Sequence, residues 1–213
     1  MTGFPQAEFG PELVAALNGE LGADSPHRFT TSRERPARGP VSLTDVRYGV
    51  SVLTGDDTYL LTFLRENRGW AHGATQDKHL LVAAARAWLA GTGLEEMAAR
   101  WPFVEFSELQ LAYERGDALD TQWRIVRRSG SEPYREVVEL AAEHSTINRF
   151  FPALGHNFLL QPGPFDSWIL ASVAVQTPGR FRLWTPDAEE PLAEGDATSM
   201  IAELVELLNS LEG

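Results

Sequence analysis

The stretch VSLTDVRYGVSVLTGDDTYLLTFL, residues 41–64, contains two β-rich runs, VRYGVSVL and TYLLTFL. Between them stands Thr54-Gly55-Asp56-Asp57, whose residue types favour a turn. β-branched and aromatic residues are enriched in strands, so the stretch predicts a β-hairpin. This hairpin places the first sheet of the fold near the N-terminus.

From Thr75 onward the apolar residues follow a helical period instead. LLVAAARAWLA, residues 80–90, places Leu81, Ala85 and Trp88 on one face of a predicted helix that ends before Gly91. Ser107 and Gln110 have the spacing of a capping box, which opens another helix. We expect about five short helices between residues 75 and 150.

The last third of the chain returns to strands. HNFLL, WILASVAVQ and RFRLW are separated by Pro- and Gly-containing turns, as in a meander, and Asp196 precedes a final helix with an apolar stripe. Strands and helices are segregated along the chain, which predicts an α+β fold. Its expected parts are an N-terminal β-hairpin, a central block of short helices, and a C-terminal antiparallel meander with a closing helix. No internal repeat stands out in the sequence.

The domain organisation follows from the same patterns. Residues 1–40 are expected to form an N-terminal helix, at residues 11–21, followed by an Arg-rich loop. Residues 41–213 are expected to form a single α+β domain, because 213 residues are enough for one sizeable core.

Composition limits the classes of partner. Eighteen basic and thirty acidic side chains leave a net charge of -12, which disfavours binding to nucleic acid and to anionic membrane surfaces. No apolar run approaches the roughly 20 residues that a membrane span needs. The N-terminus lacks the pattern of a secretory signal, and the chain has no cysteine. We therefore expect a cytoplasmic protein.

Strong catalytic signatures are absent from the sequence. It contains no G-x-S-x-G, no P-loop, no H-E-x-x-H and no G-x-G-x-x-G motif after a strand. No two histidines have the helical spacing of metal ligands; His72, His79 and Asp77 could converge only through a loop-to-helix turn. The catalytic residues are thus unknown at this stage, and we expect neither a cofactor nor a metal.

A candidate ligand site lies in RENRGWAHGATQD, residues 65–77, read as a loop between a strand and a helix. Arg68 could pair with a substrate carboxylate and His72 could transfer protons near neutral pH. Trp70 in the same loop, and Trp168 near the C-terminal strands, could stack on a ligand. The expected ligand-binding set is Arg68, Trp70, His72, His156, Asp166 and Trp168.

Other clusters are expected to be structural. Trp88, Trp101 and Trp123 fall on apolar helix faces and are expected in the core. The arginines at 124, 127 and 128 are expected to form a solvated surface, because few aromatic residues accompany them.

Three segments resemble an actinobacterial family of unknown function whose members carry the description "natural product biosynthesis protein". These segments are RGWAHGAT, ARAWLAG and LEEMAARWPFVEFSELQLAYERGD. The family's R-x-W-x-x-G-x-T pattern matches residues 68–75, and the similarity extends over about residues 45–210. The family has His-Gly where this chain has Gly155-His156. The resemblance implies a biosynthetic setting and no particular reaction.

Two functions fit these observations. The first is a small accessory or tailoring protein of natural product biosynthesis, which binds a small molecule, a precursor peptide or another protein of the same pathway. Under this hypothesis, His72→Ala is expected to spare folding and abolish ligand binding or turnover. The alternative is a non-catalytic immunity or adaptor protein that binds a basic protein partner, which the acidic net charge favours.

Overall fold

The computed structural model describes residues 10–31, 40–55, 58–129, 132–166 and 168–211. The chain divides into two compact units, Met1–Glu114 and Arg115–Gly213, where the sequence led us to expect one domain from residue 41 onward. Each unit has its own hydrophobic core, one around Trp88 and the other around Phe158. No Pro-, Gly- or Ser-rich linker separates the units, so composition alone does not reveal this division.

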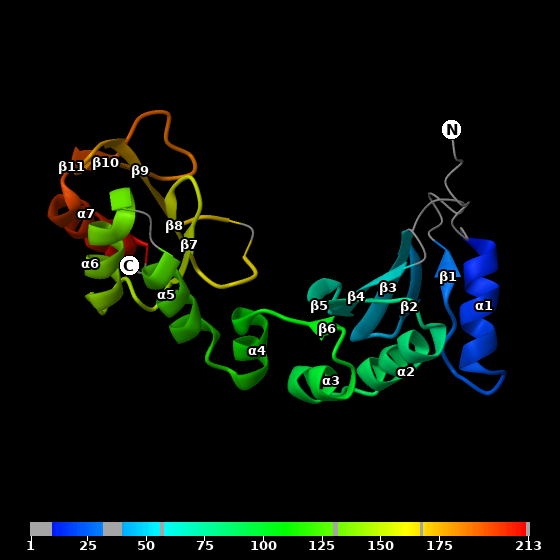
Figure 1. Cartoon of the computed structure of the whole chain (residues 1–213). Coiled ribbons are helices and arrows are strands. Elements are labelled where there is room, and N and C mark those ends of the chain that lie inside the picture. The colour runs from blue at the N-terminus through cyan, green and yellow to red at the C-terminus, as the bar shows by residue number, and fades with distance from the viewer. Residues whose placement is uncertain (1–9, 32–39, 56–57, 130–131, 167, 212–213) are drawn as a thin grey trace, which may run out of the picture. The chain divides into compact units, whose positions relative to one another are not determined.

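The N-terminal unit contains an antiparallel sheet of six strands in the order β1-β2-β3-β4-β5-β6. Helix α2 contacts β3, β4 and β5, and α1 contacts α2 (Figure 1). The elements are α1 (Pro11–Leu21), β1 (Thr30–Thr31), β2 (Val41–Thr44), β3 (Tyr48–Gly55), β4 (Thr58–Arg65), β5 (Arg68–Thr75), α2 (Lys78–Leu89), α3 (Leu94–Arg100), β6 (Val104–Glu105) and α4 (Glu108–Arg115).

The expected N-terminal helix is part of this unit and not a separate segment. Leu13, Leu17 and Leu21 on α1 are buried in the same core as Trp88 of α2. Spacing of four residues places these leucines on one face, which packs against the unit. Residues 32–39 of the expected Arg-rich loop lie outside the described residues.

The predicted β-hairpin is confirmed. β3 and β4 pair antiparallel from Tyr48 opposite Arg65 to Gly55 opposite Thr58. Asp56 and Asp57 of the expected turn lie outside the described residues.

Most of the segment at residues 65–77, which the sequence predicted as a loop, is the strand β5 (Arg68–Thr75). The turn before it is Glu66-Asn67, and both residues have positive φ, 52° and 62°. Two successive positive φ values are typical of a type I′ turn, so β4 and β5 form a second tight hairpin. A shift of register interrupts the alternation of β5 and hides the strand period in the sequence.

Helix α2 begins at Lys78, three residues after Thr75, where the helical pattern of the sequence starts. The side chain of Asp77 accepts hydrogen bonds from the N–H groups of His79 and Leu80, at 2.8 and 3.2 Å. Thr75 lies two residues earlier and accepts from the N–H of Asp77. The residue that satisfies the free N–H groups of the first turn is therefore Asp77.

The C-terminal unit contains an antiparallel sheet of five strands in the order β11-β10-β9-β8-β7. Helix α7 contacts β10, β11 and α6, while α5 contacts β7 and α6 (Figure 1). The elements are α5 (Ala118–Ser129), a 3-10 turn (Glu132–Tyr134), α6 (Arg135–Glu143), β7 (Phe151–Leu154), β8 (Phe158–Gln161), β9 (Ala171–Thr177), β10 (Arg180–Trp184), β11 (Ala193–Gly195) and α7 (Ala197–Ser210).

The two units share a topological core, to which α3, β6 and α4 are added in the first unit and α5 in the second. Each has a helix, then five strands paired in chain order, then a closing helix that the first helix contacts. An aspartate caps each closing helix, Asp77 for α2 and Asp196 for α7. The α+β class, with N-terminal strands, central helices and a C-terminal meander before a closing helix, is confirmed. The topological repeat was not predicted, because no repeat is visible in the sequence.

No helix in the described part of the chain combines the length and the apolar character that crossing a membrane requires.

Candidate functional site

The expected ligand-binding residues divide between the two units. Those on β5 belong to the N-terminal unit, and the others lie in two loops of the C-terminal unit. The N-terminal group is Arg68, Trp70 and His72, and the C-terminal group is His156, Asp166 and Trp168.

Trp70 is a packing residue. Its side chain is only 7% exposed, because β5 bulges here: Gly69 pairs with Leu64 and Ala71 pairs with Phe63, which leaves Trp70 as the extra residue. The ring lies 5.6 Å from that of Tyr113 on α4, and the guanidinium of Arg65 lies 5.2 Å from its centroid. Burial raises the pKa of Tyr113 to about 12, and the charge of Arg68 acts in the opposite direction.

His72 lies in a polar row across the open side of the same sheet. Its Nε2 is 3.4 Å from Oε2 of Glu105 on β6, and the two side chains are 65% and 73% exposed. Water therefore competes strongly for this pair. The register partners that form the row, all half-exposed or exposed, are Thr30, Ser42, Ser51, Thr62, His72 and Glu105.

The C-terminal candidates are exposed loop residues. His156 lies in the β7–β8 turn, and its carbonyl oxygen accepts a 2.6 Å hydrogen bond from the hydroxyl of buried Tyr134. Asp166 and Trp168 lie in the β8–β9 loop, and Trp168 is 57% exposed. The contact at His156 is made by its backbone, so it holds the turn in place whatever the imidazole does.

A groove in the C-terminal unit brings several charged side chains together. Its volume is about 830 Å³, and its lining comes from α5, from the end of α6 and from the α6–β7 loop. The lining residues are Leu119, Asp120, Trp123, Arg124, Arg127, Arg128, Ala142, Asn148 and Arg149. We call this concavity the arginine groove.

The base of the arginine groove is held by Trp123. Its indole Nε1 donates hydrogen bonds to the carbonyl oxygens of Asn148 and Phe150, at 2.8 and 3.1 Å. The indole ring packs beside Phe158, with ring centroids 6.1 Å apart. One buried side chain thus ties α5 to the loop that carries Arg149.

Three of the guanidinium groups of the arginine groove are anchored by defined contacts. Arg124 donates to the hydroxyl of Thr121, which is fully buried. Arg127 forms an ion pair with Glu139 of α6, and this hydrogen bond and charge raise the pKa of Arg127. Arg149 donates through Nε to the carbonyl of Thr146 at 3.1 Å. Such anchoring reduces the side-chain entropy that a bound anion would have to overcome.

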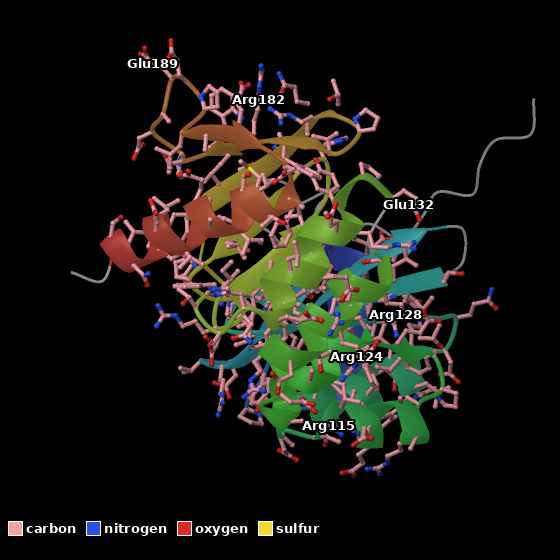
Figure 2. All side chains as sticks on the ribbon, turned by 90° about the vertical axis from the view of Figure 1, so that its left-hand side faces the viewer. Arg115, Arg124, Arg128, Glu132, Arg182 and Glu189 are labelled. Atoms are coloured by element: carbon pink, nitrogen blue, oxygen red, sulfur yellow. The ribbon has the colours of Figure 1, made fainter. Side chains whose placement is uncertain are left out.

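The fourth guanidinium belongs to Arg128, which lies one helical turn beyond Arg124. Figure 2 shows both residues on α5. Residues four apart lie on the same face of a helix, so the two guanidinium groups belong to one wall of the groove.

The local charge is opposite to that of the whole chain. Residues 115–213 contain eight arginines and fifteen acidic residues, yet four of those arginines line the groove beside one acidic residue, Asp120. Guanidinium groups bind carboxylates and phosphates with two parallel hydrogen bonds, and the apolar base excludes water from part of the groove. This arrangement is suited to an anion with an apolar portion.

The sequence signalled only part of the arginine groove. Arg124, Arg127 and Arg128 are visible as a cluster, which we expected to be solvated surface. Arg149 joins them only because the α6–β7 loop returns to α5. The expectation that Trp88, Trp101 and Trp123 are core residues is confirmed, since none is more than 6% exposed.

A second hollow, of about 570 Å³, lies in the N-terminal unit between the α1–β1 loop and the end of α2. Arg86 donates to the carbonyl of Leu21, and Arg28 donates to the carbonyls of Ala23, Ser25 and His27. These arginines stabilise the loop, so we treat this hollow as structural.

In the comparisons with known proteins, no family model, no curated protein and no solved structure matches this chain. Within the described ranges, no three histidine, aspartate or glutamate side chains are grouped as a metal site would require.

Proposed function

We propose that this protein binds an anionic small molecule, or an acidic segment of a precursor peptide, in the arginine groove. Its setting is that of a cytoplasmic accessory or tailoring protein of natural product biosynthesis, and this setting rests on the family resemblance. The observation that carries the binding proposal is the convergence of Arg124, Arg127, Arg128 and Arg149 around an apolar base in an acidic protein.

The lining favours binding over catalysis. Its nine residues include no histidine, serine, threonine or tyrosine, so the groove presents no ordinary nucleophile or proton shuttle at neutral pH. Asp120 is the only carboxylate in the lining. Reaction chemistry at this site would have to come from the ligand or from another protein.

Direct titration tests the proposal. Isothermal titration calorimetry with benzoate and with phenyl phosphate should give saturable binding that weakens as salt is added, because ion pairs between exposed groups are screened. The double variant Arg124→Gln/Arg149→Gln should lose about tenfold or more in affinity, which corresponds to about 1.4 kcal/mol. Both arginines are exposed, so the variant should fold normally.

Two matched controls locate the site. Arg180→Gln removes an exposed arginine of the same unit that does not line the groove, and it should leave the affinity unchanged. His72→Ala should also leave it unchanged. Loss of binding in His72→Ala but not in the double arginine variant would instead place the site where the sequence predicted it.

The alternative, a non-catalytic immunity or adaptor protein for a basic partner, rests on the net charge of -12. Such a partner would have to bind outside the arginine groove, because like charges repel. Stoichiometric capture of one basic protein from the native host would favour this alternative. It would do so only if neither anion raised the melting temperature.

A further inference from the structure

The arginine groove follows one face of α5 along most of that helix. Its α5 residues fall in two adjacent rows at four-residue spacing, which places them on one face. They are Leu119, Trp123 and Arg127 in one row, and Asp120, Arg124 and Arg128 in the other. A helix rises 1.5 Å per residue, so this face is roughly 13 Å long from its first to its last lining residue. The lining on this side of the groove is therefore extended along the helix axis.

The groove is open to solvent along this length. Of its nine lining residues, Trp123 is buried, Leu119 and Ala142 are half-buried, and the other six are exposed. Sites for drug-sized molecules bury about 70–90% of the ligand surface in a mostly apolar pocket. A lining as exposed as this one leaves one side of its ligand in water, which suits a segment of a longer chain.

Apolar and basic groups occupy different positions along the α5 face. Leu119 lies at its start, Arg124 near its middle and Arg128 at its end. The carboxylate of Asp120 beside Leu119 disfavours an anionic group at the start of the face. A ligand that uses the whole face must therefore carry an apolar group at one end and its acidic groups towards the other.

The guanidinium groups alone are not expected to give tight binding. Arg124, Arg128 and Arg149 each take part in further interactions within the protein, and Arg127 pairs with Glu139. An anion has to compete with these interactions, and its exposed ion pairs gain little. Apolar contact with Leu119 would add binding free energy that does not depend on this competition.

We infer that the ligand of the arginine groove is an extended peptide segment of about four residues, with an apolar side chain near Leu119 and acidic side chains towards Arg124 and Arg128. This inference rests on the proposed function, because it chooses the peptide over the small molecule at the same groove. An extended chain rises about 3.3 Å per residue, so four residues match the length of the α5 face.

Capped peptides of equal charge test the inference. Acetyl-Leu-Gly-Glu-Glu-amide and acetyl-Glu-Glu-Gly-Leu-amide carry the apolar residue at one end or the other, whereas acetyl-Gly-Gly-Glu-Glu-amide and acetyl-Glu-Glu-amide lack it. All four carry the same two carboxylates, so differences in affinity do not report charge. Calorimetry with the full chain at low salt should show one leucine peptide binding about tenfold more tightly than both peptides without leucine.

Leu119→Ala tests the position of the apolar contact. It should remove most of the tenfold gain and leave the binding of acetyl-Glu-Glu-amide unchanged, which would also show that the variant is folded. Leu192→Ala removes an exposed leucine of the same unit outside the groove, and it should change neither affinity. Saturation-transfer NMR with the unsubstituted protein provides a second readout, in which the leucine methyl protons of the peptide should receive the strongest transfer.

The outcomes separate two levels of failure. Equal affinities for the four peptides, or a gain that survives Leu119→Ala, would overturn the peptide inference and leave anion binding in place. Binding of benzoate or phenyl phosphate without binding of any peptide would do the same. Absence of binding by all of these probes would overturn the proposed function together with the inference.

Discussion

Trp123 donates a 2.8 Å hydrogen bond to the carbonyl of Asn148, twenty-five residues away along the chain. This contact joins α5 to the α6–β7 loop, so that Arg149 lines the same groove as the arginines of α5. A side chain that is 6% exposed thereby determines the geometry of an exposed basic site.

Trp123→Phe should destabilise the C-terminal unit. Phenylalanine fills much of the same space but leaves the carbonyls of Asn148 and Phe150 without the indole donor. Asn148 is exposed and Phe150 is half-buried, so the loss should be that of an ordinary hydrogen bond, about 0.5–1.5 kcal/mol. Urea denaturation should show a fall of that size in the free energy of unfolding. Trp168→Phe, the same change at a largely exposed position, is the control and should have little effect.

Trp70 and His72, neighbours on β5, should respond oppositely to alanine. Trp70→Ala empties a space between β5 and Tyr113, and large-to-small changes of buried aromatic residues cost about 3–5 kcal/mol. His72→Ala removes an exposed side chain and should change stability by less than about 0.5 kcal/mol. Thermal unfolding of both variants measures the difference. Marked destabilisation by His72→Ala would show that the polar row is structural.

The β4–β5 turn offers a stabilising substitution. Glu66 has φ of 52°, a conformation that asparagine tolerates better than glutamate. Glu66→Asn should therefore raise the free energy of unfolding by roughly 0.5–1 kcal/mol, part of the 1–2 kcal/mol that left-handed backbone costs. Loss of the exposed Arg47–Glu66 ion pair, 3.7 Å apart, should offset little of this gain. Glu190→Asn in an exposed loop serves as the control, and an equal gain there would exclude the turn as the cause.

Asp196 should make the closing helix of the C-terminal unit sensitive to acid. Hydrogen bonds from Ser199 lower the pKa of this carboxyl below 3.8. A lowered pKa in the folded state means that the stabilisation is present above the unfolded pKa and is lost as the pH falls through the folded value. Asparagine caps a helix without titrating, so Asp196→Asn should make the melting temperature fall less steeply than that of wild type as the pH drops below about 4. Parallel curves for the two proteins would contradict this assignment.

Much of the local structure could be predicted from the sequence. The β3–β4 hairpin is confirmed, and so is the Ser107–Gln110 capping box, in which each residue bonds to the other's backbone N–H. Asp196 caps α7 as expected. These features depend on residues within a few positions of one another, which is why spacing and residue type are sufficient.

The strand at residues 68–75 could not be predicted in the same way. Its bulge at Trp70 buries two successive residues, Trp70 and Ala71, and so breaks the two-residue period on which strand prediction depends. The turn between β4 and β5 contains Glu66 and Asn67 rather than the Asn-Gly or Asp-Gly pairs that usually mark such hairpins.

By itself the sequence determined the α+β class, most of the helices and strands, and three of the four buried tryptophans among the described residues, because hydrophobic periodicity and capping are properties of neighbouring residues. Tertiary structure decided which apolar faces pack together, and so divided the chain into two units with the same topological core. Tertiary structure also brought the residues of the arginine groove together. Arg149 reaches the arginines of α5 through contacts between distant segments, such as the bond from Trp123 to Asn148, and no local pattern encodes such contacts.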